Sequence, residues 1–284
     1  MKYETLKSYS DEEFRRITGV KRTTFEKMLE ILRRSFVLKH VQGGRRPKLP
    51  LEEQLLASLE YIREYRTYAH IAASYQIDES NIYRIIRWVE DTLVRDGTFS
   101  LPGRKALLKS DTEYEVVLVD ATESPIERPK RGQKRYYSGK KKRHTIKTQV
   151  VVNKADGQII CTSFANGRCH DFRLFKESRL RMDSKIKAVV DTGYLGITKF
   201  HANSIIPIKR SKKRSLTKFD KVFNRKVSSE RVLNEQVISL IKRFKIVSDR
   251  YRNRRKRFGL RFNLICGICN FEKMIVSQEV YCLL

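Results

Sequence analysis

Hydrophobic positions recur with a helical period from residue 10 onward. Ser10 stands before three acids, Asp11 to Glu13, which predicts an N-cap followed by a first turn suited to the helix dipole. A second helical pattern begins at Thr23 and is broken by the glycines and proline of residues 43–47. A third covers residues 51–65, where leucine and aromatic positions lie three or four residues apart. The N-terminal third is therefore predicted to be α-helical.

Residues 67–94 show two further helical patterns, separated by a tight turn at residues 76–78. Gln76 stands where such a turn usually has glycine, because the backbone there has a positive φ. The pattern predicts a helix-turn-helix whose second helix enters the major groove of DNA. An ordinary helical hairpin is the alternative. Contacts to DNA are predicted from Ser80, Asn81, Tyr83, Arg84 and Arg87.

After residue 110 the pattern changes to short apolar runs typical of strands, mixed with helices. Strands are expected at residues 115–120, 145–153, 159–164, 186–191 and 205–208, and helices at 171–180, 229–247 and 259–276. Mixed strands and helices favour an α/β fold with one mixed sheet and flanking helices. The expected domains are an N-terminal helical segment at 1–45, the helix-turn-helix domain at 46–100 and the α/β domain at 111–284.

Two of the predicted strands end in an acid, Asp120 and Asp191. A charge directly after an apolar run is unfavourable unless it is used, although either residue alone is more often a turn initiator. If the strands are neighbours in the sheet, the two carboxylates lie together and need a cation between them. Oxygen ligands without His or Cys favour Mg²⁺ or Mn²⁺.

A third acid is expected from the helix beside the sheet, and Glu235 is the candidate. Arg231, Glu235 and Lys242 fall on one helix face, because they are four and seven residues apart. Glu230 is the competing acid, at the start of the predicted helix. Three such carboxylates would hold two divalent ions about 3.5–4 Å apart, which suits in-line phosphoryl transfer.

Charge strengthens this interpretation. The 284 residues contain 61 Lys and Arg against 32 Asp and Glu, a formal net charge of +29. Most of the excess lies in three basic segments, residues 128–147, 209–226 and 242–261, which together contain only two acids. Nearly single-sign segments favour phosphate binding over an ordinary solvated surface. The first segment includes Lys140, Lys141, Lys142 and Arg143, which are predicted DNA contacts.

Other features exclude alternative classes of protein. No run of 18 apolar residues and no N-terminal apolar segment is present, so neither a membrane span nor a secretory signal is expected. A cytoplasmic protein is therefore expected. The five cysteines are too few and too scattered for a disulfide framework. The spacing of Cys266 and Cys269 permits a metal or redox site, but core packing within an apolar helix is favoured.

These residues resemble the DDE transposases of bacterial insertion sequences, in the insertion-sequence-five-like group related to the PIF/Harbinger elements. The resemblance covers roughly residues 45–275. The matching stretches are Leu118–Glu123, Tyr137–Lys147, Gly157, His170–Asp171, Val190–Tyr194, the helix with Arg231, Glu235 and Lys242, and the helix at 262–271.

The resemblance implies an RNase H-like catalytic domain in which Asp120, Asp191 and Glu235 hold the metal. It also implies that Arg231 and Lys242 lie near the DNA backbone and that His170 and Asp171 support the site. Related families have a tyrosine three positions before the arginine, where this chain has Ser228, so that tyrosine's role is not expected here.

The expected function is transposition. The helical part would bind double-stranded DNA at the terminal inverted repeats, and the α/β part would cut it with Mg²⁺ or Mn²⁺ and join the 3′ end to target DNA. Pairing two DNA ends predicts a homo-oligomer on DNA. A non-catalytic DNA-binding protein derived from a transposase and a plain RNase H-like nuclease are the alternatives.

Overall fold

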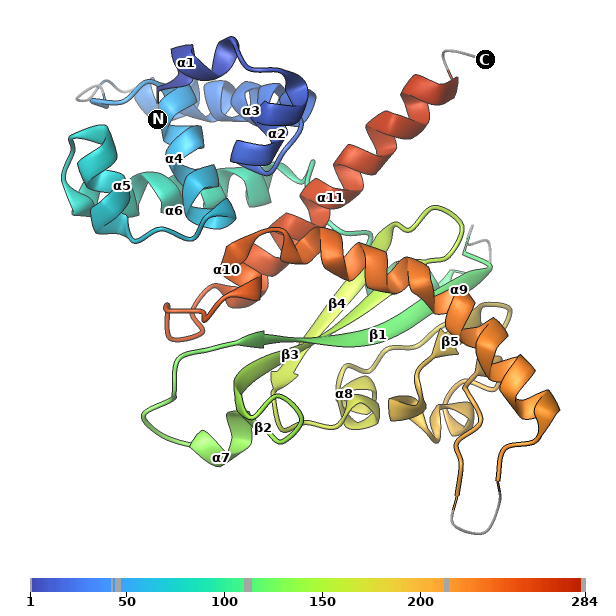
Figure 1. The fold of residues 1–284 in the computed structure, drawn as a ribbon. Helices are drawn as coiled ribbons and strands as arrows, with labels where there is room; N and C mark the ends of the chain where they lie inside the picture. The colour runs from blue at the N-terminus through green and yellow to red at the C-terminus, as the bar shows by residue number, and fades with distance from the viewer. Residues whose placement is uncertain (1, 42, 44–46, 110–113, 212–214, 282–284) are drawn as a thin grey trace. The chain divides into compact units, whose positions relative to one another are not determined.

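A computed structural model describes residues 2–41, 43, 47–109, 114–211 and 215–281 (Figure 1). Parts of the predicted break at 43–47 and of the second basic segment lie outside these residues. The chain forms two compact units. The helical unit comprises residues 1–100, 241–249 and 257–284, and the sheet unit comprises 101–240 and 250–256. The units therefore join parts of the chain that the expected domain boundaries separate, and those boundaries stay a prediction.

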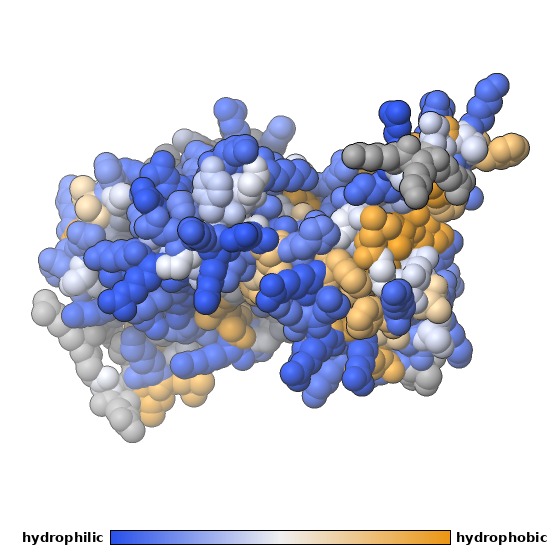
Figure 2. All heavy atoms as spheres, turned by 90° about the horizontal axis from the view of Figure 1, so that it is seen from below, coloured by the Kyte–Doolittle hydropathy of each residue, from blue (hydrophilic) through white to orange (hydrophobic). Residues whose placement is uncertain are grey.

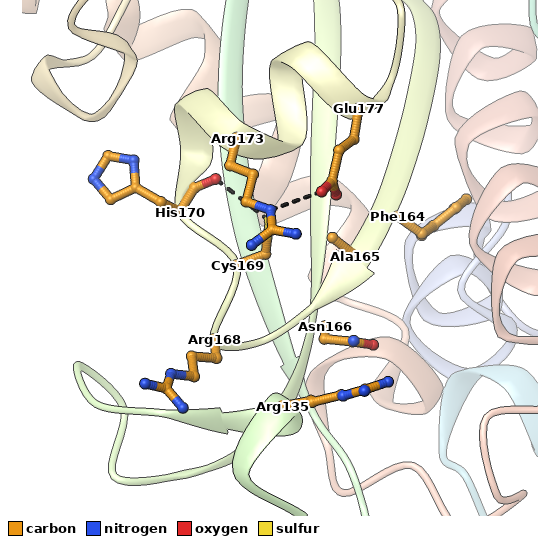
Figure 3. Close-up of a pocket in the computed structure, with 9 residues that line it drawn as sticks. All are labelled: Arg135, Phe164, Ala165, Asn166, Arg168, Cys169, His170, Arg173 and Glu177. Atoms are coloured by element: carbon orange, nitrogen blue, oxygen red, sulfur yellow. Dashed lines mark hydrogen bonds and ion pairs between the residues drawn. The ribbon is translucent and has the colours of Figure 1, made fainter. Parts of the chain in front are cut away.

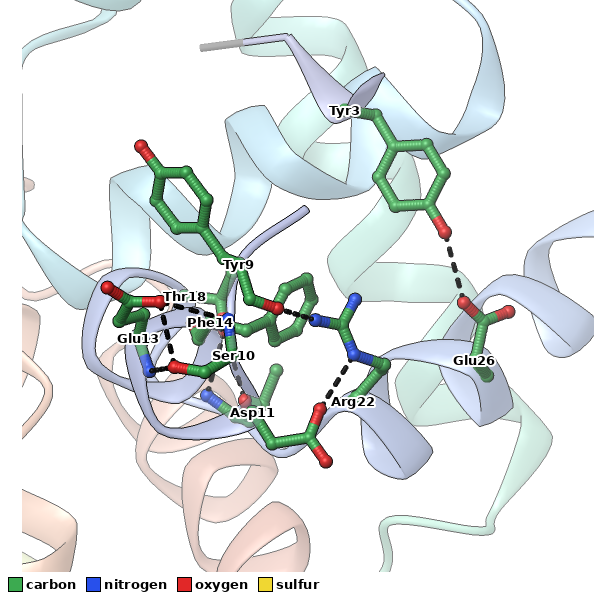
Figure 4. Close-up of polar contacts among 10 residues, drawn as sticks. Tyr3, Tyr9, Ser10, Asp11, Glu13, Phe14, Thr18, Arg22 and Glu26 are labelled. Carbon is green, nitrogen blue, oxygen red and sulfur yellow. Dashed lines mark hydrogen bonds and ion pairs between the residues drawn. The ribbon is translucent and has the colours of Figure 1, made fainter. Parts of the chain in front are cut away.

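The helical unit contains the N-terminal helices and the last two helices of the chain. They are α1 (Tyr3–Lys7), α2 (Asp11–Thr18), α3 (Arg22–His40), α4 (Leu51–Arg63), α5 (Tyr68–Tyr75), α6 (Glu79–Asp96), α10 (Lys245–Ser248) and α11 (Phe258–Tyr281). Ser10 caps α2 as predicted, through a reciprocal capping box with Glu13. Figure 4 shows this box beside the Asp11–Arg22 ion pair, whose atoms are 2.8 Å apart.

The predicted helix-turn-helix is confirmed in α5 and α6. Asp78 caps α6, accepting a hydrogen bond from the Ser80 N–H at 2.8 Å. Gln76 has φ 53° and ψ 42°, the left-handed conformation expected of this turn. Ile71, Ile82, Ile86 and Val89, which lie at apolar positions of the two helical patterns, are buried.

A buried ionic cluster fastens α11 to α6 inside the helical unit. Glu90 is completely buried and accepts hydrogen bonds from Arg257 at 2.9 Å and from Arg261 at 2.6 Å. Arg261 is itself only 2% exposed. Helix α6, the helix that is predicted to contact the major groove, is thus held in place by residues at least 167 positions later in the chain.

Cys266 and Cys269 lie in the core of the helical unit, as predicted. Both thiols are buried, and a Cβ on Gly267 between them would be 1.8 Å from the Phe99 carbonyl oxygen. The helix therefore packs directly against the backbone at Phe99. Among the helices of the described residues, none combines the length and apolar character needed to cross a membrane.

The sheet unit is built on one mixed sheet in the order β2-β3-β1-β5-β6, with β4 also paired to β3. Its strands are β1 (Val116–Pro125), β2 (Tyr137–Ser138), β3 (Arg143–Asn153), β4 (Ile159–Asn166), β5 (Lys187–Val190) and β6 (Ser204–Ile205). Its helices are α7 (Gln133–Tyr136), α8 (Asp171–Glu177), α9 (Lys218–Lys242, which ends in the helical unit), and the 3₁₀ helices η1 (Arg104–Leu108), η2 (Thr192–Tyr194) and η3 (Ile197–Lys199). Strand β3 pairs antiparallel with both β1 and β4. Strand β5 pairs parallel with both β1 and β6. The predicted mixed α/β fold is confirmed.

Side-chain alternation gives the sheet two different faces. Val117 and Val119 of β1 pack with Val151 and with Phe175 of α8 in one hydrophobic cluster. Alternation therefore directs Asp120 to the opposite face, where α9 contributes Arg231. Figure 1 shows α9 running along the sheet on the side away from α8.

Several predicted boundaries were wrong, and the helix expected to end at residue 247 ends at Lys242. The first strand does not end at Asp120 but continues to Pro125, because β3 pairs with it along its whole length. Helix α9 begins at Lys218 rather than at residue 229, so Glu230 lies inside it. The strand expected at 205–208 is only the two-residue β6.

Candidate active site

The parallel pairing of β1 with β5 places Asp120 and Asp191 at the same level of the sheet. The last residues in register are Val119 and Val190, and each acid is the next residue. Asp120 stays in β1, opposite Val150 of β3. Asp191 leaves β5 and caps η2 by accepting a hydrogen bond from the Thr192 N–H. The expected adjacency of these two strands is therefore observed.

A single guanidinium lies between the two carboxylates. Arg231 Nη2 is 3.4 Å from Asp120 Oδ2, and Arg231 Nη1 is 3.7 Å from Asp191 Oδ1. The side chains of Arg231 and Asp120 are 14% and 18% exposed, so water screens this interaction only weakly. The two acids and Arg231 form one electrostatic group.

Burial raises the pKa of the Asp120 carboxyl above its ordinary value. Arg231 and the Ala121 N–H, which donates to Asp120 Oδ1 at 2.8 Å, act in the opposite direction. The nearby Asp191 and Asp171 raise this pKa further. Asp120 is thus a carboxylate that lacks solvation and whose charge would be stabilised by an added cation.

Tyr194 is a neighbour of this group. Its hydroxyl is buried and, among the described residues, has no hydrogen-bond partner. Burial raises the pKa of this hydroxyl well above its ordinary value, and Asp120, Asp171 and Asp191 raise it further. The tyrosine is therefore a neutral neighbour of three acids and contributes no charge of its own.

Glu235 lies on α9 one turn beyond Arg231, and its side chain is exposed. In the parts of the chain that the structure describes, no group of three His, Cys, Asp or Glu side chains is close enough to hold a metal. The structure thus brings Asp120 and Asp191 together and leaves Glu235 outside a preformed cluster. Glu230 is directed elsewhere, into an ion pair with Lys154 at 2.9 Å.

A second polar group lies on the α8 side of the sheet. Lys147 is buried and ion-paired with Asp171 at 2.8 Å, and it lies 3.8 Å from Glu123. A Cβ on Gly193 would be 2.7 Å from Asp171 Oδ2, so this carboxylate packs against the loop that follows Asp191. Asp171 supports the loop of the second acid, whereas His170, the preceding residue, is exposed.

Sequence reasoning missed Glu123 and the buried state of Lys147. The signal was available in the pairing register, since Glu123 stands directly opposite Lys147 in β1 and β3. Opposite charges at such cross-strand positions stabilise a sheet. Lys147 was instead counted in the first basic segment, as one exposed cation among ten.

The predicted DNA contacts on α6 are arranged on its outer face. Ser80, Tyr83 and Arg84 are exposed, while Asn81 and Arg87 are half-buried. Arg87 donates a hydrogen bond to the Tyr83 hydroxyl at 3.0 Å, which fixes the direction of both side chains.

In the sheet unit, Lys140, Lys141 and Lys142 are exposed in the turn after β2, and Arg143 begins β3. Lys242 is the half-buried last residue of α9. Figure 2 shows hydrophilic side chains, in blue, over much of the face that it presents.

Comparison with known proteins gives consistent matches to both halves of the chain. A family model described as DDE superfamily endonuclease matches residues 119–270, and one described as helix-turn-helix of DDE superfamily endonuclease matches residues 47–99. The chain is 45% identical over 272 residues to a protein of Microchaete diplosiphon described as the probable transposase for insertion sequence element IS702. That alignment covers 96% of this chain and 98% of the relative. No solved structure gave a significant match.

Proposed function

Because the chain belongs to the DDE superfamily endonucleases, as a transposase of the bacterial insertion-sequence type, we propose that Asp120, Asp191 and Glu235 are the acids with which it cuts DNA. The family has an RNase H-like catalytic domain that depends on divalent metal, and its helix-turn-helix domain binds DNA. The observation that carries the proposal is the pair of carboxylates from adjacent parallel strands that share one guanidinium.

The donor set fits a hard divalent cation. Asp120, Asp191 and Glu235 offer only oxygen ligands, and the poorly solvated charge of Asp120 favours a cation beside it. We propose Mg²⁺, as two ions, which when bound would activate the attacking hydroxyl and stabilise the leaving 3′ oxygen. The role of Arg231 is to neutralise the two aspartates and to contact a DNA phosphate nearby, and Lys242 offers a second cation on the same helix.

The remaining residues bind and position the DNA. Residues of α6 from Ser80 to Arg87 would contact the terminal inverted repeats in the major groove. Lys140 to Arg143, exposed beside the sheet, would contact phosphates of the element end or of target DNA. Asp171 would support the site by packing against the loop after Asp191, and His170 would do so indirectly, as the N-cap residue of the helix that carries Asp171.

The active form is proposed to be a homo-oligomer on DNA, because two element ends must be cut and joined together. An exposed apolar face on the first turns of α9 supports this proposal, since large apolar side chains are usually covered. It consists of Phe219 at 87%, Val222 at 69% and Phe223 at 39% exposure.

The experiment that tests the catalytic proposal compares three variants, Asp120→Asn, Asp191→Asn and Glu235→Gln. Each is expected to lower Mg²⁺-dependent cleavage of element-end DNA by at least about a hundredfold, because removing one preorganised charged group typically has that effect on the rate. DNA binding should stay within a few-fold of wild type. The matched control is Glu230→Gln, an acid on the same helix that is paired to Lys154, and it should cut normally.

The result for Glu235 decides the third acid. If Glu235→Gln cuts at the wild-type rate while Glu230→Gln does not, the assignment on α9 is wrong. A gel that separates cleaved ends from strand-transfer products distinguishes a transposase from a plain nuclease. If the wild-type protein binds DNA but does not cut it, the protein is a non-catalytic DNA-binding protein derived from a transposase.

A further inference from the structure

A groove lies at the end of β4, where the chain turns into α8 (Figure 3). Its volume is about 900 Å³, within the usual span for ligand sites of about 300–1,000 Å³. Three arginines, Arg135, Arg168 and Arg173, line it together with Phe164 and His170. Arg135 belongs to the first basic segment, and none of the other residues that line the groove was predicted to contact DNA.

Beside the groove, the turn after β4 is packed closely on its neighbours. A Cβ on Gly167 would be 2.0 Å from Thr145 Oγ1 and 2.7 Å from the Tyr136 carbonyl oxygen. The Gly167 N–H donates to the Thr145 carbonyl at 2.9 Å, and the Arg168 N–H donates to the Arg135 carbonyl at 3.2 Å. These backbone bonds hold the main chains of Arg135 and Arg168 next to each other, and their side chains extend in different directions at one end of the groove (Figure 3).

The charge in the groove is only partly compensated. Arg173 is paired with Glu177 at 2.7 Å. Arg135 and Arg168 are exposed, and within the described residues neither has an ion-pair partner. Arg168 also lines a second depression of about 670 Å³, together with Arg128 and Lys134. Positive charge thus continues from one depression into the next, as a path for a chain of phosphates requires.

Phe164 gives the groove an aromatic side chain at the edge strand β4, whereas Arg173 and Glu177 line the groove from α8, on the opposite side of the sheet from Asp120. Thr122 of β1, Thr148 of β3 and Phe164 of β4 stand opposite one another across the three strands. Paired residues point to the same face, and Thr122 is two residues from Asp120, so Phe164 lies on the Asp120 face. Two strand spacings separate β4 from β1, about 10 Å in all. The ring is 37% exposed.

We propose that this groove binds unpaired nucleotides of the DNA strand next to the cleavage point, with a base stacked on Phe164 and phosphates on Arg135 and Arg168. A positively charged groove with an exposed aromatic ring is the usual construction of single-strand sites. The separation of about 10 Å between the strands that carry Phe164 and Asp120 suits a nucleotide one or two positions from the scissile phosphate. This inference rests on the proposed DNA-cutting function and names a subsite of it.

The test compares two DNA substrates with the full-length protein in EDTA, where no cutting is expected. One is a blunt duplex of the element end, and the other carries a four-nucleotide unpaired tail containing 2-aminopurine. Phe164→Ala is expected to weaken binding of the tailed DNA roughly 5- to 140-fold, the effect of losing one stacked base at about 1–3 kcal/mol. Binding of the blunt duplex should change less than about twofold, and the 2-aminopurine quenching that wild type shows should disappear.

Matched variants separate this role from folding and from general charge. Phe164→Tyr keeps a stacking ring and should restore both affinity and quenching. Arg168→Ala should weaken the tailed DNA more than the blunt duplex, whereas Arg181→Ala, an exposed arginine outside the groove, should not discriminate between them. Equal losses on both substrates, or no loss with Phe164→Ala, would overturn the proposal. Cutting by Asp120→Asn is measured separately. The proposed nucleotide subsite can therefore be refuted while the catalytic proposal stands, and the catalytic proposal can be refuted while the subsite stands.

Discussion

Two neighbouring arginines in the loop before α11 adopt a backbone conformation that side chains avoid. Arg254 and Arg255 have φ of 47° and 68°, in the left-handed region. The loop is held in place by the Tyr251 hydroxyl, which donates to the Lys256 carbonyl at 2.6 Å, and by Arg255, which lies over the Tyr136 ring at 4.4 Å. Left-handed backbone costs a residue with a Cβ about 1–2 kcal/mol. Such strain persists where the side chains have a use, and in this basic loop we expect that use to be DNA binding.

Arg254→Gly should therefore stabilise the protein and lower its affinity for DNA. Glycine removes the strain but gains freedom in the unfolded chain, so the free energy of unfolding should rise by about 0.5–1 kcal/mol. DNA affinity should fall several-fold with the lost charge. Arg254→Ala loses the same charge and keeps the strain, so it should match the glycine variant in binding but not in thermal denaturation. Equal melting temperatures for the two variants would contradict the argument.

At the residue scale, the sequence predicted the aspartates better than their surroundings. Asp120 and Asp191 were identifiable because a charge after an apolar run is unusual. Glu123 was missed because its partner Lys147 is recognised only once the register of β1 and β3 is known. The position of Glu235 outside a preformed cluster was equally hidden, since helical spacing gives the face of a residue but not its distance from a sheet.

At the scale of elements, Glu90 joins α6 to α11 by a buried charge that needs its partners. Glu90→Ala leaves Arg261, only 2% exposed, without its carboxylate. Breaking a buried ion pair from one side is destabilising by about 3–5 kcal/mol. Chemical denaturation of the full chain should show a loss of that size, with much less for Glu79→Ala, an exposed acid on the same helix. A loss no larger than that of the control would mean that the pair contributes little.

Elements with a clear cap or a clear buried stripe were predicted closely, and others were not. The helix-turn-helix followed from the tight turn at residues 76–78 and from a regular apolar spacing on either side of it. The first turns of α9 were not predicted to be helical, because their apolar residues, Phe219 and Val222 among them, are exposed and form no buried stripe. The extension of β1 past Asp120 escaped because it depends on pairing with β3, which local composition does not reveal.

At the scale of the whole molecule, the sequence could not predict that the last helix belongs to the same compact unit as residues 1–100. Helix α11 is apolar on most sides, so its sequence indicates burial without naming what covers it. Its packing with α6 depends on Arg257 and Arg261, which in the sequence were part of the third basic segment. Two cations expected at the surface are in fact structural, so the charge available for DNA is smaller than the net +29 suggests.

That correction makes the salt dependence of DNA binding a quantitative test. Each phosphate neutralised contributes a slope of about −0.9 to the plot of log affinity against log salt concentration. The triple variant Lys140→Ala, Lys141→Ala and Lys142→Ala removes three exposed cations and should reduce the slope by up to about 2.7. A control that removes the exposed Arg179, Arg181 and Lys185 loses the same charge outside the basic segments. Its slope should stay near wild type, because net charge acts at long range and only direct phosphate contacts release counterions. Equal slopes for the two variants would mean that the basic segments attract DNA without contacting it.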